Sequence, residues 1–112
     1  MIELTILNHL SEQLPVPVYM ELPSGAPDRF VVLRKADSGR ENFISSAMFT
    51  FRSYGESLLE AARLNEQVKA AMDRLSELDA VASARLNGDY PFPDTSIKRH
   101  CYQAVYDITH YD

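Results

Sequence analysis

Residues 55–78, GESLLEAARLNEQVKAAMDRLSEL, carry the clearest structural signal in the chain, a single apolar stripe at helical spacing. Charged side chains take the opposite side, so the pattern predicts an amphipathic helix that lies on a sheet or on another helix. Ser53 and Glu56 have the spacing of a capping box, which predicts that the helix begins near Ser53. The apolar stripe consists of Leu58, Ala61, Ala62, Leu64, Val68, Ala71, Met72, Leu75 and Leu78.

The N-terminal segment predicts a second, shorter helix over residues 2–13. Its apolar side chains recur at four-residue spacing, and Pro15 ends the pattern. The stretch that follows, PVPVYMELP (residues 15–23), contains several prolines. Because proline cannot donate a hydrogen bond to a neighbouring strand, we expect any strand here to lie at an edge of the sheet. The helical spacing rests on Ile2, Ile6 and Leu10.

An antiparallel hairpin is predicted between the two helices. Residues 29–37, RFVVLRKAD, are rich in β-branched and aromatic side chains, as strands are. Residues 43–53, FISSAMFTFRS, alternate between two faces. Residues 38–42, SGREN, are expected to form the short turn between these strands. One face carries Phe43, Ser45, Ala47, Phe49 and Phe51, and the other carries Ile44, Ser46, Met48, Thr50 and Arg52.

Two more strands are predicted after the long helix. Residues 80–89, AVASARLNGD, form a strand pattern whose end is marked by Asn87-Gly88, and YPFPD (residues 90–94) is too rich in proline for an interior strand. Residues 96–111, SIKRHCYQAVYDITHY, are β-prone and contain neither glycine nor proline. The face expected to point to the core carries Tyr102, Ala104, Tyr106 and Ile108.

The order of elements is therefore helix, three strands, long helix, two strands, within a single domain spanning residues 1–112. This order predicts an α+β fold: a mostly antiparallel (mixed) sheet of about four or five strands, flanked by the N-terminal helix and one long central helix. The connection through the long helix is the one crossover able to create a parallel pair.

The composition is that of a soluble globular domain, with 46% hydrophobic and 24% charged residues among 112. The formal net charge of −5 argues against general affinity for nucleic acid, which depends on many Lys and Arg contacts to phosphate. We expect neither a signal peptide nor a membrane span, because the N-terminus has no basic region and the chain has no long apolar run. The single cysteine, Cys101, excludes an internal disulfide and fits a reducing compartment.

The residues that most often carry chemistry are spread out. His100 and His110 are ten residues apart on one predicted strand, roughly 33 Å, too far to share a metal ion. Cys101 follows His100 directly, so their side chains are expected on opposite faces of the strand. The carboxylates Asp89 and Asp94 flank a proline-rich turn, where Asp commonly bonds to its own backbone. We therefore expect no enzymatic activity, no metal site and no cofactor.

An interaction surface explains the aromatic residues of the C-terminal quarter better than catalysis does. Tyrosine has an apolar ring and a polar tip, and it is enriched at protein interfaces. The arm DYPFPD (residues 89–94) is expected either to lie against its own domain or to reach a neighbouring subunit. We name Tyr90 and Phe92 in this arm as candidate interface residues. Arg40, in the predicted hairpin turn, is the third candidate, with an ordinary solvated turn as the alternative.

Two segments resemble the small tail terminators, or head–tail joining proteins, of long-tailed bacteriophages and prophages, the family of the lambda tail terminator. They are FTFRSYGESLLEAARLNEQVKAAM (residues 49–72) and DYPFPDTSIKRHCYQAVYDITHY (residues 89–111), and the likeness covers residues 43–111. It consists of a strand, the SYG…SLLEAA helix start, and a late KR..YQAVYDI strand. It extends to the N-terminal helix and hairpin by element order and by length.

The resemblance implies a ring, usually a hexamer, that caps the tail tube, ends its polymerisation and joins the tail to the head. The implied partners are further copies of the chain, the tail tube protein and a head-completion or connector protein, in the virion and, during assembly, in the host cytoplasm. DNA is expected to pass the lumen without specific binding, which an acidic subunit favours. Two alternatives stay open: another connector of the virion, and a small α+β ligand-binding domain or enzyme.

Overall fold

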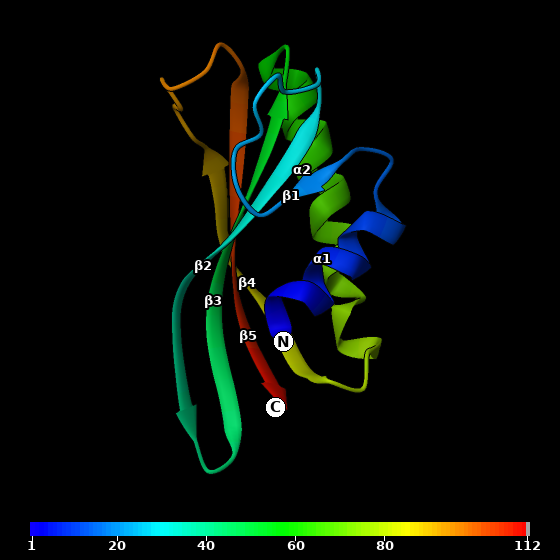
Figure 1. Ribbon diagram of the computed structural model, residues 1–112, viewed down its shortest axis with the longest axis vertical. Helices are drawn as coiled ribbons and strands as arrows, with labels where there is room; N and C mark the ends of the chain where they lie inside the picture. The colour runs from blue at the N-terminus through cyan, green and yellow to red at the C-terminus, as the bar shows by residue number, and fades with distance from the viewer. Residues whose placement is uncertain (112) are drawn as a thin grey trace.

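The computed structural model describes residues 1–111 and confirms the predicted α+β class, with two helices on one face of a five-stranded mixed sheet (Figure 1). The molecule is elongated, with principal extents of 43 × 24 × 24 Å. The elements in chain order are α1 (Ile2–Gln13), β1 (Val18–Tyr19), β2 (Phe30–Glu41), β3 (Ile44–Gly55), α2 (Leu58–Asp73), the 3₁₀ turn η1 (Leu75–Glu77), β4 (Val81–Pro91) and β5 (His100–Tyr111).

The strands lie in the order β1-β2-β3-β5-β4, so β5 is inserted between β3 and β4. The pairs β2–β3, β3–β5 and β4–β5 are antiparallel, and the short strand β1 pairs in parallel with β2. The crossover through the long helix, which we identified as the one connection able to create a parallel pair, does not create one, because β5 lies between the two strands that this helix connects. β1 lies at the edge of the sheet, as its prolines predict.

The main core lies between the sheet and the two helices. The stripe of α2 buries Leu64, Val68 and Met72 completely or almost completely, and α1 does the same with Ile6 and Leu10. The alternation predicted for the two long strands is also confirmed here. The strand side chains that are buried on this face include Ala47, Phe49 and Phe51 from β3 and Ala104, Tyr106 and Ile108 from β5.

A second, smaller cluster covers one end of the opposite face of the sheet. It consists of Phe30, Val32, Tyr54 and Cys101, with the rings of Phe30 and Tyr54 stacked at 4.6 Å between centroids. The loop after β1 and the loop before β5 contribute partly buried side chains to it. The face of β5 that carries Cys101 therefore has a core of its own at this end. The loop residues in this cluster are Leu22, Ala26, Phe92 and Ile97.

The hairpin turn lies farther along the chain than we expected. β2 continues through residues 38–41, and the turn is made by Asn42 and Phe43, whose φ angles are +52° and +67°. The prediction of a turn at SGREN was wrong because the side chains at the end of β2 are exposed and polar, which makes a strand look like a loop. Phe43 consequently does not share the core-facing side of β3, and its side chain is 83% exposed.

Two other boundaries also differ from the predictions. The α2 helix is capped by Ser57, whose side chain accepts a hydrogen bond from the Glu60 backbone, because β3 runs on through residues 53–55. The first stripe residue, Leu58, lies in the first turn of α2 and is 46% exposed. Asn87 marks a bulge, since β4 shifts register between Leu86 and Gly88 and continues to Pro91. Within residues 1–111, neither helix has the length and apolar character that crossing a bilayer requires.

Candidate functional site

Two of the three predicted interface residues, Tyr90 and Phe92, belong to one connected cluster on the sheet face away from the helices. Arg52 of β3 donates a hydrogen bond to Gln103 of β5 over 2.9 Å, and the Gln103 amide donates to the Tyr90 hydroxyl over 2.7 Å. The Arg52 guanidinium carbon lies 4.0 Å from the centroid of the Phe92 ring, a cation–π contact. Arg52 therefore joins the two residues of the arm to the middle of the sheet.

A hydrogen bond between Tyr54 and Asp94 holds the end of the arm against the sheet. The Tyr54 hydroxyl donates to an Asp94 carboxylate oxygen over 2.7 Å, and the other oxygen accepts bonds from the backbone and side chain of Ser96. Burial raises the pKa of Tyr54 well above its usual value, and the bond to Asp94 raises it further. Burial also acts to raise the pKa of Asp94, but the bonds from Ser96 and Tyr54 outweigh it and lower this pKa. The tyrosine is neutral and the aspartate charged at physiological pH.

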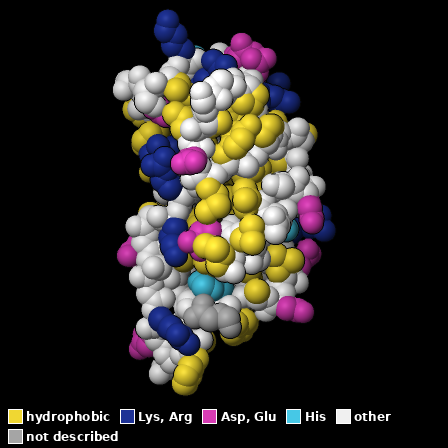
Figure 2. All heavy atoms as spheres, in the orientation of Figure 1, with side chains coloured by type: hydrophobic (Ala, Val, Ile, Leu, Met, Phe, Trp, Pro, Cys, Tyr) yellow, Lys and Arg dark blue, Asp and Glu magenta, His cyan; other side chains and the backbone are white. Residues whose placement is uncertain are grey.

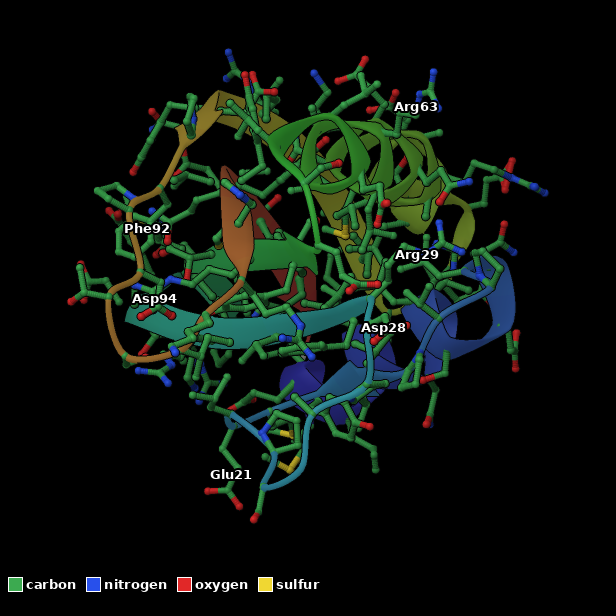
Figure 3. All side chains as sticks on the ribbon, turned by 90° about the horizontal axis from the view of Figure 1, so that it is seen from above. Glu21, Asp28, Arg29, Arg63, Phe92 and Asp94 are labelled. Atoms are coloured by element: carbon green, nitrogen blue, oxygen red, sulfur yellow. The ribbon has the colours of Figure 1, made fainter. Side chains whose placement is uncertain are left out.

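The arm thus lies against its own domain, which was one of the two arrangements that the sequence left open. Phe92 is partly buried in the second cluster, and its backbone amide donates to the Cys101 carbonyl over 2.9 Å. Tyr90 keeps 44% of its surface exposed and is accessible to a partner. Figure 3 shows Phe92 and Asp94 on one side of this end of the molecule and Glu21 on another loop.

Arg40, the third predicted residue, is far from this cluster. It is exposed on β2 near the hairpin turn, which Figure 1 places at the opposite end of the long axis. The same end also exposes apolar side chains: besides Phe43, Ile44 is 44% exposed and its strand partner Tyr111 is 54% exposed. The sequence prediction named a polar residue of this end, Arg40, and missed the aromatic residue of the turn, Phe43.

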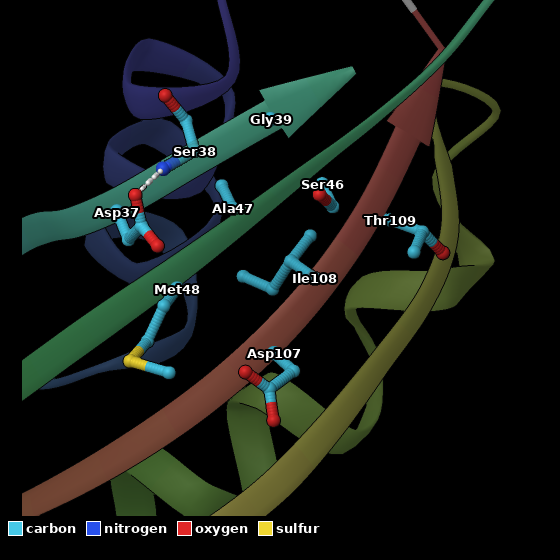
Figure 4. A pocket seen from close by; sticks show the side chains of 9 residues that line it. All are labelled: Asp37, Ser38, Gly39, Ser46, Ala47, Met48, Asp107, Ile108 and Thr109. Carbon is cyan, nitrogen blue, oxygen red and sulfur yellow. Dashed lines mark hydrogen bonds between the residues drawn. The ribbon is translucent and has the colours of Figure 1, made fainter. Parts of the chain in front are cut away.

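The half of the sheet nearest the hairpin turn has a depression of about 240 Å³ between β2, β3 and β5 (Figure 4). The small residues Gly39 and Ser46 line it, together with two carboxylates, Asp37 and Asp107. Asp37 accepts a bond from the Ser38 backbone and Asp107 from the Asn87 side chain. Both carboxylates already have hydrogen-bond partners, so the depression has the character of a contact surface rather than of a built ligand site.

The groups considered for chemistry have structural surroundings. The His9 ring contacts the Ala71 carbonyl over 2.7 Å and connects α1 to α2, while His100 and His110 occupy the two ends of β5. Burial raises the pKa of the Cys101 thiol to about 12, which disfavours the reactive thiolate at neutral pH. Among residues 1–111, no three His, Cys, Asp or Glu side chains gather closely enough to hold a metal ion.

A partly buried charged cluster fastens α2 to β4 on the helix side of the sheet. The Lys69 ammonium lies 2.9 Å from an Asp89 oxygen and 2.6 Å from a Glu66 oxygen, and the Asn65 amide donates to the same Asp89 oxygen over 2.8 Å. The bonds to Glu66 and Asp89 raise the pKa of Lys69, which stays charged. Asp89 thus holds the start of the arm against the helix layer.

Comparisons with protein families and with curated proteins do not indicate a role for this surface. No protein-family model matches the chain, and a comparison with curated proteins finds no match.

Proposed function

We propose that the chain is a structural subunit of a phage or prophage tail, without catalytic activity. Copies assemble head to tail into a closed ring, with six expected, that caps the tail tube, ends its polymerisation and joins the tail to the head. The subunit contacts its own copies, the tail tube protein and a head-completion or connector protein. It acts at the head–tail junction of the virion after assembly in the host cytoplasm.

One observation carries this proposal: a single chain presents two different exposed apolar surfaces at separate places. The hairpin turn carries Phe43, 83% exposed, at one end of the molecule, and Met20, 44% exposed, lies on the loop after β1. A closed ring requires such a pair, because each subunit offers one patch to the neighbour before it and another to the neighbour after it. In Figure 2, hydrophobic side chains gather in the upper half of the face shown and reappear at its lower tip.

Two further features support the proposal. The observed fold has the architecture that the resemblance implies, an α+β subunit with an N-terminal helix and one long central helix on a mostly antiparallel sheet. The formal net charge of −5 suits a lumen through which DNA passes without being held. Glu66 and Asp73 are exposed on α2, and Glu56 is exposed just before it.

Deletion of the gene from the phage genome that encodes this chain tests the proposal. We expect tail tubes of uncontrolled length that fail to join heads, with both defects repaired when the chain is supplied in trans. Tubes of normal length that fail to join would instead indicate a connector of the head. Normal virions with unchanged tails would refute a structural role in the tail.

A further inference from the structure

The hairpin turn between β2 and β3 combines backbone strain with an exposed aromatic ring. Both turn residues have positive φ, the geometry for which two-residue hairpins favour Asn-Gly. Asn42 fits the first position, but Phe43 occupies the second at φ +67°, where a bulky side chain is a genuine outlier. Its ring is 83% exposed, so the strain brings no burial within the chain. Such an outlier points to a role outside the isolated subunit.

The apolar surface at this end is larger than one ring. Ile44 follows Phe43 and is 44% exposed, and Tyr111, its partner on β5, is 54% exposed. We call Phe43, Ile44 and Tyr111 the hairpin tip. The tip is convex, because it ends the long axis of the molecule (Figure 1).

A concave apolar surface lies on the same chain beside β1, the strand at one edge of the sheet. The short strand β1 and the loop after it, residues 18–24, form an open groove of about 850 Å³ together with Leu7 of α1. Val18, Met20 and Leu22 line it, and Met20 keeps 44% of its surface exposed. We call this surface the edge groove. Glu21 is exposed beside it.

We propose that the hairpin tip of one subunit docks in the edge groove of the next. This docking rests on the proposed ring and names the contact that closes it. The aromatic ring of Phe43 meets the flexible thioether of Met20, a favourable sulfur–aromatic pair. Arg40, exposed near the tip, and Glu21, beside the groove, carry opposite charges and fix the orientation.

The geometry requires the two surfaces to come from different copies. Figure 1 places the tip at the lower end of the molecule and the segment that forms the groove in its upper half, so one subunit cannot fill its own groove. The tip is convex and the groove concave, so two tips facing each other bury much less surface than a tip in a groove. The contact is therefore heterologous, and such contacts generate closed rings when the rotation between subunits closes.

Photo-crosslinking from position 43 tests the contact directly. A benzophenone amino acid replaces Phe43 in the full chain, and copies labelled with ¹⁵N are mixed with unlabelled copies before irradiation. We expect crosslinked peptides that join the two isotopic forms and map to residues 18–24. Crosslinks within one copy, to the arm around Phe92, or to no protein at all would overturn the docking.

Substitution separates docking from folding. Phe43→Gly removes the ring and relieves the positive φ, so we expect an unfolding temperature at or above that of the wild type. The same variant is expected to weaken self-association ~10-fold or more, because a central aromatic anchor is lost. Leu59→Ala, which alters a 60% exposed side chain outside both surfaces, is the control and should leave self-association unchanged.

The two proposals fail in different ways. Rings that persist unchanged in Phe43→Gly would overturn the docking and leave the role in the tail intact. A wild-type chain that crosslinks to residues 18–24, while its deletion leaves tails normal, would overturn the role in the tail and leave the docking intact.

Discussion

Gly55→Ala tests how closely the first turn of α2 packs against the end of β3. Gly55 ends β3, and a Cβ atom there would lie 2.8 Å from the Ala61 backbone nitrogen and 2.9 Å from the Glu60 Cβ. Ordinary contact begins at about 3.4 Å, so the first turn of α2 has to retreat by about 0.6 Å. Most of the clash is with the helix itself, which cannot rotate away as a flexible side chain can.

The expected cost follows from two opposing effects. Overpacking of a close-packed region costs about 1–3 kcal/mol, and a backbone clash belongs near the upper end of that range. Replacing glycine also restricts the unfolded chain, which returns about 0.4–1 kcal/mol. We therefore expect Gly55→Ala to lower the free energy of unfolding by about 2 kcal/mol, and the unfolding temperature by about 8–12 °C for a domain of this size.

Gly88→Ala is the matched control. A Cβ atom at Gly88 meets nothing within 4 Å, and this glycine lies outside the positive-φ region. The control keeps the effect on the unfolded chain without the clash, so its stability should equal or slightly exceed that of the wild type. Urea unfolding followed by circular dichroism measures both variants. Equal stabilities of Gly55→Ala and Gly88→Ala, within about 0.5 kcal/mol, would refute the packing described for the β3–α2 junction.

Three further predictions concern single side chains. Ser57→Ala removes the cap of α2 and should lower the free energy of unfolding by about 1 kcal/mol in urea titrations, whereas the exposed Ser76→Ala should not. Asp94→Asn should flatten the acid limb of the stability–pH curve: the folded-state pKa of Asp94 is below its ordinary 3.8, so its contribution is present above that pH and is lost as the pH falls through the folded-state pKa. An unchanged acid limb would contradict this. Burial raises the pKa of Cys101 to about 12, so a disulfide reagent at pH 8 should react ~100-fold or more slowly with the native protein than with the urea-unfolded chain.

Local patterns were sufficient for the elements whose burial is regular. The four-residue spacing of α1 and the alternation of β3 and β5 each reflect one buried face. Such a periodicity can be recognised from the sequence alone. The class of the fold followed from the order of these elements. The edge position of β1 could also be predicted, because the prolines around it cannot donate hydrogen bonds to a second neighbouring strand.

Boundaries failed where pairing across the sheet decided them. Ser53-Glu56 and Ser57-Glu60 are equally good capping boxes, and only the pairing of β3 with β5 assigns residues 53–55 to the strand. Ser38-Gly39 has the composition of a turn, yet it is paired with β3, and the strained turn comes later at Phe43. No local rule predicts phenylalanine at that position.

The candidate site was predicted in part for a similar reason. Tyr90 and Phe92 stood out by composition, but Arg52, which connects them, lies about forty residues earlier in the chain. The contact exists because β3 and β5 are neighbours, and strand order is a property of the whole fold. The groove at residues 18–24 was likewise visible only as a proline-rich segment.

The mass of the assembled protein tests the central claim most directly. Native mass spectrometry of the purified chain over a range of concentrations is expected to show a closed assembly of six copies of the 12.7 kDa chain, about 76 kDa. The assembly should dissociate in Phe43→Gly and persist in Leu59→Ala. A single-chain mass at every concentration, or a dimer built on one patch that does not extend, would contradict the proposal that this subunit forms a ring.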